Sequence, residues 1–243
     1  MKILSGYPLS PMQQGMLFHS TQEDRQGYYI EQVICNLRET LNVSVLIQSW
    51  QQVLERHSVL RTSFSTDAIL QLRQQVHEQV DLSVTQHDLQ GLPNSEQNER
   101  LTAFLWRDRQ AGFDMTVAPL MRLAVFQREG ADYTLVWTFH HALLDGRSIA
   151  MVLQEVFALY DGKILGQKSS LPDRRPYQDY IAWLEQQSFA TTEPFWQNLL
   201  RGFTQPTRFA NLTYEPASGY GLLQTQLSQT LSTALTTLAQ PRT

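Results

Sequence analysis

The chain has 243 residues, of which 42% are hydrophobic and 17% are charged, and its formal net charge is −4. This length is enough for one large domain or two small ones with a sizeable hydrophobic core, and the composition is that of an ordinary globular protein. The acidic balance and the absence of any Lys/Arg run argue against nucleic acid or another polyanion as a partner.

Cysteine usage and the N-terminus bear on the compartment. The single cysteine, Cys35, cannot form an intramolecular disulfide, which predicts a reducing compartment. Its apolar neighbours favour a buried structural thiol over a nucleophile. No secretion signal follows Met1, and no apolar stretch approaches the ~18 residues that a membrane helix requires. We therefore expect a cytoplasmic protein.

Helical and strand-like patterns alternate along the first half of the chain. Ser10 can cap a helix that tolerates Pro11 at its first position, and Asn42 can cap a second helix. Apolar spacing and β-branched or aromatic runs predict, in chain order, a helix over 9–20, a strand over 28–38, a helix over 43–57, a strand over 60–64, one or two weak strands within 69–87 and a helix over 94–111.

The second half opens with the two strongest strand patterns, joined at Glu129-Gly130 as a hairpin. The predicted elements are strands over 119–127 and 133–139, a helix over 148–161, a loop over 163–175, and helices over 176–187, 192–201 and about 229–239. Interleaved helices, strands and hairpins predict an α/β or α+β sandwich. The last helical pattern stops before a following element could bury its face, so we expect a chain cut from something longer.

The segment His140–Gly146 (HHALLDG) carries the strongest chemical signal. A neutral imidazole is the natural proton acceptor near neutral pH. A strand delivers both histidines to its end, and adjacent residues of an extended segment point to opposite faces, so only one can face a given cavity. Ser148 can cap the following helix or hydrogen-bond a reacting group, and the helix N-terminus would favour a developing oxyanion.

A histidine pair beside an aspartate is also common in metal sites and in structural clusters. A zinc site would need further ligands, but His57, His77 and His87 lack ligand spacing and Cys35 stands alone. We therefore expect no metal. The five tryptophans occupy apolar helical or strand positions, and we expect them to serve packing: Trp50, Trp106, Trp137, Trp183 and Trp196.

Four segments in order resemble the condensation domains of nonribosomal peptide synthetases. They are Tyr7–His19 (YPLSPMQQGMLFH), Arg56–Phe64 (RHSVLRTSF), His140–Gly146 (HHALLDG) and Tyr177–Trp183 (YQDYIAW). Four ordered motifs are far more specific than one, and the resemblance spans essentially the whole chain.

The resemblance implies a chloramphenicol-acetyltransferase-like lobe, a two-layer α/β (α+β) sandwich with a mixed, largely antiparallel sheet and flanking helices. Residues 1–175 would form this N-terminal lobe, and residues 176–243 would form linker helices and the beginning of a second, truncated lobe. The implied reaction joins a donor acyl or peptidyl thioester to an acceptor aminoacyl thioester. Phosphopantetheine arms of two carrier proteins would present both thioesters, an adenylation domain would adjoin, and no cofactor would bind directly.

By motif position, the resemblance implies that His141 is the catalytic histidine, either as general base or as an orienter of the amine. His140 would turn inward to hold the loop, and Gly146 would let the reacting groups come close. Asp145 would form a largely buried ion pair with Arg61, which is costly to break from one side. Two residues of the first helix, Ser10 and His19, would either line the tunnel or pack.

Other functions remain open from the sequence. A stand-alone acyltransferase could trimerise as chloramphenicol acetyltransferase does, and a non-catalytic module could dock carrier proteins. An epimerisation domain shares the histidine motif, whereas a heterocyclisation domain would carry aspartates in place of His140 and His141. Arg147 follows the motif where many family members carry Trp or Val, so the subtype stays open. We expect this fragment to be inactive without the rest of its domain.

Overall fold

The computed structural model describes residues 2–20, 27–66, 71–205 and 225–240. The chain divides into two compact units, Met1–Phe189 and Ala190–Thr243. The positions of the two units relative to one another are not determined.

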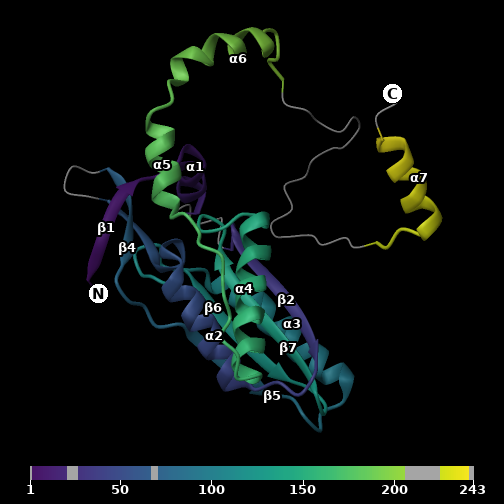
Figure 1. Cartoon of the computed structure of the whole chain (residues 1–243). Coiled ribbons are helices and arrows are strands. Elements are labelled where there is room, and N and C mark those ends of the chain that lie inside the picture. The colour runs from purple at the N-terminus through teal and green to yellow at the C-terminus, as the bar shows by residue number, and fades with distance from the viewer. Residues whose placement is uncertain (1, 21–26, 67–70, 206–224, 241–243) are drawn as a thin grey trace. The chain divides into compact units, whose positions relative to one another are not determined.

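A four-stranded sheet forms the centre of the first unit (Figure 1). Its strands, in spatial order, are β2 (Ile30–Arg38), β7 (Asp132–His140), β6 (Met121–Gln127) and β5 (Ser83–Asp88). β2, β7 and β6 pair antiparallel, whereas β5 runs parallel to β6. The parallel pair requires a crossover connection, which α3 (Asn94–Ala111) supplies.

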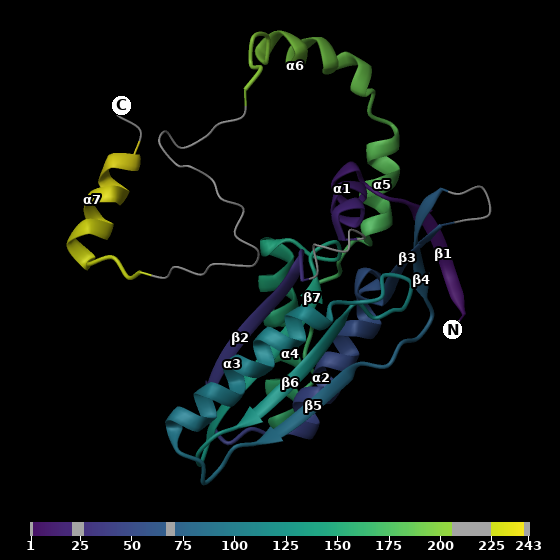
Figure 2. The same cartoon turned by 180° about the vertical axis from the view of Figure 1, so that it is seen from behind.

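Helices cover both faces of this sheet. Alternate residues of β6 and β7, such as Leu123 and Trp137, pack in the main core with α2 (Val43–Arg56) and α4 (Gly146–Ile164). The residues between them, such as Phe126 and Val136, pack on the opposite face against apolar residues of α3. Figures 1 and 2 show α2 and α4 on one side of the sheet and α3 on the other. Because both faces are buried, β7 is apolar over most of its length rather than alternating.

Helix α2 shows how the sequence sets the main core. Asn42 caps it by accepting a hydrogen bond from the backbone of Val45, as predicted. Its buried face carries Trp50, which is fully buried and whose ring centroid lies 4.8 Å from that of Trp137. Aromatic pairs at this spacing add about 0.5–1.5 kcal/mol beyond the area that they bury.

A buried carboxylate ties α3 to its face of the sheet. Asp108 accepts hydrogen bonds from Arg122 (2.5 Å), Thr138 (2.6 Å) and Gln32 (2.9 Å). A carboxylate is stable away from water only when paired and hydrogen-bonded, and these three contacts satisfy Asp108. We call these four residues the Asp108 cluster.

A smaller sheet lies in the same unit, in the order β1 (Ile3–Pro8), β4 (Leu72–His77) and β3 (Thr62–Thr66), with every pair antiparallel. A single 3-10 turn, Ser58–Arg61, connects α2 to β3, and α1 (Pro11–Ser20) follows β1. Helix α5 (Tyr177–Glu185) inserts Ile181 between Tyr7 and Val76 of this sheet. α5 therefore packs within the first unit, and the division into lobes at residue 175 stays a prediction.

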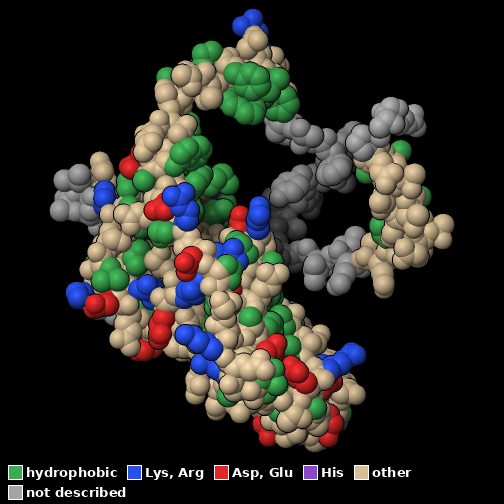
Figure 3. All heavy atoms as spheres, viewed as in Figure 1, with side chains coloured by type: hydrophobic (Ala, Val, Ile, Leu, Met, Phe, Trp, Pro, Cys, Tyr) green, Lys and Arg blue, Asp and Glu red, His purple; other side chains and the backbone are tan. Residues whose placement is uncertain are grey.

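The described part of the second unit contains α6 (Glu193–Leu199) and α7 (Gln229–Ala239), and neither helix has a buried residue. A 3-10 turn, Phe189–Thr191, spans the boundary between the two units. Figure 3 shows hydrophobic side chains gathered on α6. Among the described helices, none combines the length and the hydropathy needed to cross a membrane.

The predicted class, a mixed and largely antiparallel sheet with flanking helices, is confirmed. Helices cover both faces of the larger sheet, which makes three layers there. The prediction that all five tryptophans serve packing is wrong for three of them, since Trp106, Trp183 and Trp196 are more than half exposed. Cys35 is half-buried against the main core, and burial raises the pKa of its thiol.

Candidate active site

The two histidines of the motif point to opposite faces of the sheet, as predicted. β7 ends at His140, whose side chain continues the set that faces α3, and His141 follows on the face of α2 and α4. His141 lines a pocket on that face, whereas His140 is 1% exposed and does not reach the pocket. The alternation of an extended chain therefore separates a structural histidine from an accessible one.

His140 holds the loop through a fully satisfied chain of hydrogen bonds. Its Nδ1 accepts from the backbone of Ala142 (3.1 Å), so the neutral ring carries its proton on Nε2, which donates to Ser20 Oγ (3.0 Å). Ser20 in turn donates to the carbonyl of Met16 (2.8 Å). Burial, with a smaller effect of the neighbouring His141, lowers the pKa of His140 to about 4. His140 is therefore neutral near pH 7.

His141 presents one free ring nitrogen. Its Nδ1 lies 2.6 Å from the carbonyl oxygen of Leu144. Because a carbonyl only accepts, Nδ1 must donate, and the neutral ring then has an unprotonated Nε2. Among the described residues, nothing hydrogen-bonds this Nε2. The loop thus fixes both the tautomer and the direction that a general base requires.

The pocket around His141 has a volume of about 880 Å³, within the range of small-molecule sites. Its apolar wall includes Met16, Val59 and Leu143. The polar and charged groups that line it come from α1 and the residue before it, the C-cap of α2, the loop that follows β7, the start of α4, and α5 with the segment that leads into it. They are Ser10, Gln13, His57, His141, Asp145, Arg147, Ser148, Arg174, Arg175, Tyr177 and Tyr180.

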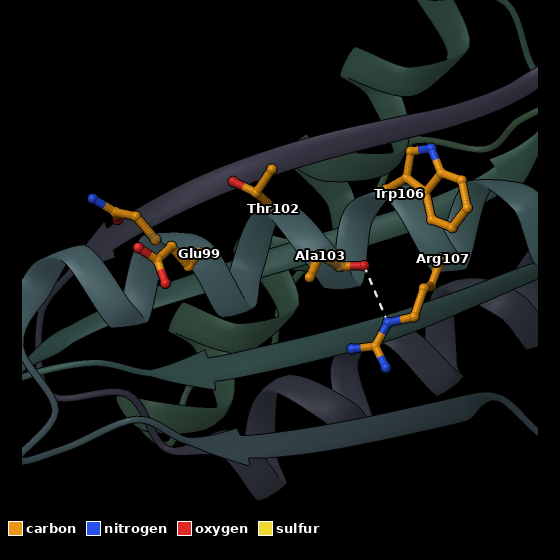
Figure 4. Close-up of a pocket in the computed structure, with 6 residues that line it drawn as sticks. Glu99, Thr102, Ala103, Trp106 and Arg107 are labelled. Atoms are coloured by element: carbon orange, nitrogen blue, oxygen red, sulfur yellow. Dashed lines mark hydrogen bonds between the residues drawn. The ribbon is translucent and has the colours of Figure 1, made fainter. Parts of the chain in front are cut away.

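A second, shallower hollow lies on the outer face of α3, where Trp106 and Arg107 form one end (Figure 4). None of its six lining residues lines the pocket of His141. It carries no pair of groups arranged for acid-base chemistry.

The predicted ion pair between Asp145 and Arg61 is wrong. Asp145 is exposed and is the N-cap of α4, where its carboxylate accepts from Ser148 N (2.8 Å) and Ser148 Oγ (2.6 Å). These hydrogen bonds, the side-chain one first, lower the pKa of Asp145. Arg61 is buried elsewhere and donates to the carbonyls of His77 and Glu78. Asp145 and Arg61 thus each have hydrogen-bond partners other than one another, Ser148 for Asp145 and two backbone carbonyls for Nη1 of Arg61.

Ser148 and Gly146 also differ in detail from expectation. α4 begins at Gly146, so Ser148 lies inside the first turn and supports the Asp145 cap instead of capping the helix itself. Gly146 does not adopt a left-handed conformation, and the position that a Cβ would take there is open. The glycine is therefore not required by backbone strain, while the open space beside it is compatible with a close approach by substrate.

The structure gives Ser10 and His19, the two candidates for lining the tunnel, different surroundings. Ser10 is buried and lines the pocket, whereas His19 is not among the lining residues and packs near Tyr29. Ser10 Oγ accepts from Gln13 N (3.2 Å), and Gln13 Oε1 accepts from Ser10 N (3.0 Å). This reciprocal pair is a capping box, and its S-x-x-Q pattern is visible in the sequence.

Gln13 is a site residue that the sequence reasoning missed. Its Nε2 donates to the carbonyl of Ala142 (3.1 Å), directly after His141, and also to Gln74 Oε1 (3.3 Å). Gln74 donates back to Gln13 Oε1 (3.1 Å). The buried amide pair connects the start of α1 and the smaller sheet to the histidine loop.

This geometry places an imidazole of fixed direction at a pocket, with Nδ1 held by a backbone carbonyl and Nε2 left without a partner among the described residues. No group of three or more His, Cys, Asp or Glu side chains is arranged to hold a metal ion in the part of the chain that the structure describes.

Comparison with known proteins gives the family. The family model of the condensation domain matches residues 4–242. A linear gramicidin synthase from Brevibacillus parabrevis is 40% identical over 239 residues, 96% of this chain and 5% of the relative. Surfactin synthase subunit 3 of Bacillus subtilis (strain 168) is 34% identical over 236 residues, 96% of this chain and 18% of the relative. The chain belongs to the condensation-domain family of nonribosomal peptide synthetases.

Solved structures support the same fold. The starter condensation domain of the rhizomide synthetase RzmA superposes with a TM-score of 0.71 at 18% identity, over 83% of this chain and 49% of that one. The EpoB cyclization-docking bidomain from Sorangium cellulosum gives 0.67 at 22% identity, over 81% and 39%. This chain spans about half of the RzmA domain and a small part of the long synthetases.

Proposed function

We propose that this chain is the N-terminal portion of a condensation domain that forms an amide between two carrier-bound thioesters. The observation that carries the proposal is the position of His141 at the pocket, where Nδ1 is fixed by Leu144 and Nε2 has no partner among the described residues. The donor would be an acyl or peptidyl thioester and the acceptor an aminoacyl thioester. Family membership supports this reaction class.

In the proposed reaction, His141 alone carries a proton from the attacking amine to the departing thiolate. The acceptor amine attacks the donor carbonyl carbon, forming the C–N bond. His141 Nε2 takes the proton that the amine nitrogen loses, and the intermediate then breaks its C–S bond. The same imidazolium returns the proton to the departing thiolate. An unprotonated Nε2 is an acceptor, which a general base requires and which would also let His141 orient the amine by accepting its N–H.

The partners in this proposal are a donor carrier protein, an acceptor carrier protein, an adjoining adenylation domain and the remainder of the condensation domain. Phosphopantetheine arms of the carrier proteins supply both thioesters, so no cofactor is bound by the chain itself. We further propose that the isolated chain is inactive, since solved condensation domains are about twice its length. A reducing, cytoplasmic setting remains a prediction from the single cysteine.

The test is amide formation between two loaded carrier proteins, followed by mass spectrometry. We expect no product from the 243-residue chain alone, and product when the chain is joined to the remaining half of a condensation domain. A joined, folded protein that gives no product with any of several loaded carrier pairs would contradict the proposal. The mass of the isolated chain in solution separately tests the alternative of a trimeric acetyltransferase-like enzyme.

A further inference from the structure

A second ionic group borders the active-site pocket. Glu155 lies on α4, is 3% exposed and faces the C-terminal end of α2. Its Oε2 lies 2.7 Å from His57 Nε2 and 3.3 Å from Arg56 Nε, and its Oε1 accepts from Arg174 Nε at 3.1 Å. We call these four residues the Glu155 cluster.

Packing alone does not account for this cluster. An unpaired carboxylate at this depth would be strongly disfavoured, and three basic side chains from two separate segments converge on this one. Burial raises the pKa of Glu155, but its hydrogen bonds to His57 and Arg174 and the charges of His57 and Arg56 outweigh burial and lower it. The carboxylate is therefore ionised and available to orient its partners.

Two of those partners line the same pocket as His141. His57 is 17% exposed and Arg174 is 37% exposed at their side chains, and both belong to the pocket wall. His57 uses Nε2 to contact Glu155, and among the described residues nothing hydrogen-bonds its Nδ1. A buried carboxylate thus fixes the direction of two polar groups that a substrate in the pocket would meet.

The cluster also fastens the segment that leads into α5. Arg56, already bound to Glu155, donates to the carbonyl of Pro172, and Arg174 of the same segment binds Glu155 directly. α5 begins just beyond, and its Tyr177 and Tyr180 line the pocket. The position of this wall relative to His141 is therefore coupled to the Glu155 carboxylate.

We propose that Glu155 is a positioning residue of the condensation reaction, which acts through His57, Arg174 and the segment 165–176 to keep the pocket wall in one arrangement around His141. It does not touch the reacting atoms. The inference rests on the proposed function. It makes the rate depend on Glu155, a residue outside the histidine motif. A displacement of about 1 Å in such a site can cost roughly a hundredfold in rate.

The first experiment uses the chain joined to the rest of its condensation domain, with loaded carrier proteins. Glu155→Gln keeps the shape and removes the charge, and we expect kcat/KM to fall by about tenfold to a hundredfold. The matched control is Glu96→Gln, which removes an exposed pair with Arg100 on α3 and is expected to leave kcat/KM unchanged. Glu155→Asp keeps the charge and should recover part of the loss.

A double-substitution cycle separates positioning from simple stability. If Glu155 acts through Arg174, the combined variant Glu155→Gln/Arg174→Gln should be no slower than the slower single variant. Losses in kcat/KM that multiply independently would overturn the inference, as would a Glu155→Gln variant that melts earlier but keeps the parent kcat/KM while folded.

Hydrogen exchange of the 243-residue chain supplies a readout without catalysis. We expect Glu155→Gln to speed amide exchange by tenfold or more in α5, whose amides are hydrogen-bonded within the helix that follows residues 165–176, with β6 and β7 unchanged. Unchanged exchange in α5 would overturn the inference even if the domain is active. An inactive parent domain would instead count against the proposed function, so the two failures are distinguishable.

Discussion

Each face of the four-stranded sheet carries a histidine and a carboxylate held by hydrogen bonds, but only one face presents such groups to the pocket. On the α3 face, His140 and Asp108 are buried and hydrogen-bonded, and neither lines the pocket. On the α2 and α4 face, His141 and Glu155 are also held by specific hydrogen bonds. However, His141 presents its Nε2 to the pocket, and Glu155 orients His57, which lines the pocket. The two faces differ in whether a histidine ring nitrogen lacks a hydrogen-bond partner within the protein, because such a nitrogen can hydrogen-bond a substrate.

The largest effect should come from the accessible histidine. His141→Ala in the joined condensation domain should lower the rate of amide formation by about 10²- to 10⁴-fold, the usual contribution of general acid-base catalysis. Because His141 is only half-buried, the melting midpoint should change little. The measurement is product formed per folded molecule.

His141→Gln sharpens this result. A glutamine amide can orient an amine by accepting its N–H with Oε1, but it cannot take up a proton at neutral pH. We expect it to be as slow as His141→Ala. A glutamine variant near the parent rate would show that His141 orients substrate and does not act as the base.

The next effect falls on stability, on the opposite face. Asp108→Ala removes the acceptor of Arg122, Thr138 and Gln32, and should lower the free energy of unfolding by about 3 kcal/mol. Urea unfolding of the 243-residue chain measures it. For the joined domain, kcat/KM per folded molecule should match the parent, in contrast to Glu155→Gln. If Asp108→Ala slowed the folded enzyme as much as Glu155→Gln does, the two faces would not differ in the way described.

His140 gives the third prediction, through pH. Its pKa is about 4 in the folded chain and near 6.5 when unfolded, so the unfolded state binds the proton first as the pH falls. Its stabilising contribution is complete above pH 6.5 and is lost toward pH 4, by up to about 3 kcal/mol. His140→Asn retains an acceptor for Ala142 but does not titrate there. Its unfolding midpoint in urea should therefore depend less steeply on pH between 6.5 and 4, and an unchanged slope would contradict the assigned cause.

Much of the fold could be predicted because its strongest patterns are local. The helices at α2 and α3, the hairpin of β6 and β7 and the opposite directions of His140 and His141 all follow from short-range spacing. β1 was missed, because Ile3–Pro8 contains Gly6 and Pro8, and its pairing with β4 joins segments far apart in the sequence. Strand pairing over such a separation depends on the tertiary fold more than on local propensity.

The polar site was harder to predict for the same reason. Gln13, Glu155 and Arg174 are ordinary polar residues in the sequence, and only the fold brings Gln13 to Ala142 and Arg174 to Glu155. Apolar spacing alone also misplaced a residue: Trp106 has helical spacing but is exposed, so an apolar residue in such a pattern need not face the core. Motifs identified the histidine loop, whereas the residues that hold it in place required the three-dimensional contacts.

Asp145 provides the smallest expected effect. As an exposed N-cap, it should lose only about 0.5–2 kcal/mol of stability when changed to alanine, whereas a buried ion pair with Arg61 would cost about 3–5 kcal/mol. Asp145→Asn should keep nearly the parent stability, because asparagine is an equally good cap but carries no charge. Urea unfolding of the two variants decides the matter. Equal, large losses of stability in both variants would support the ion pair with Arg61. A loss of stability confined to the alanine variant would confirm that the motif aspartate acts by capping α4 directly after the histidine loop.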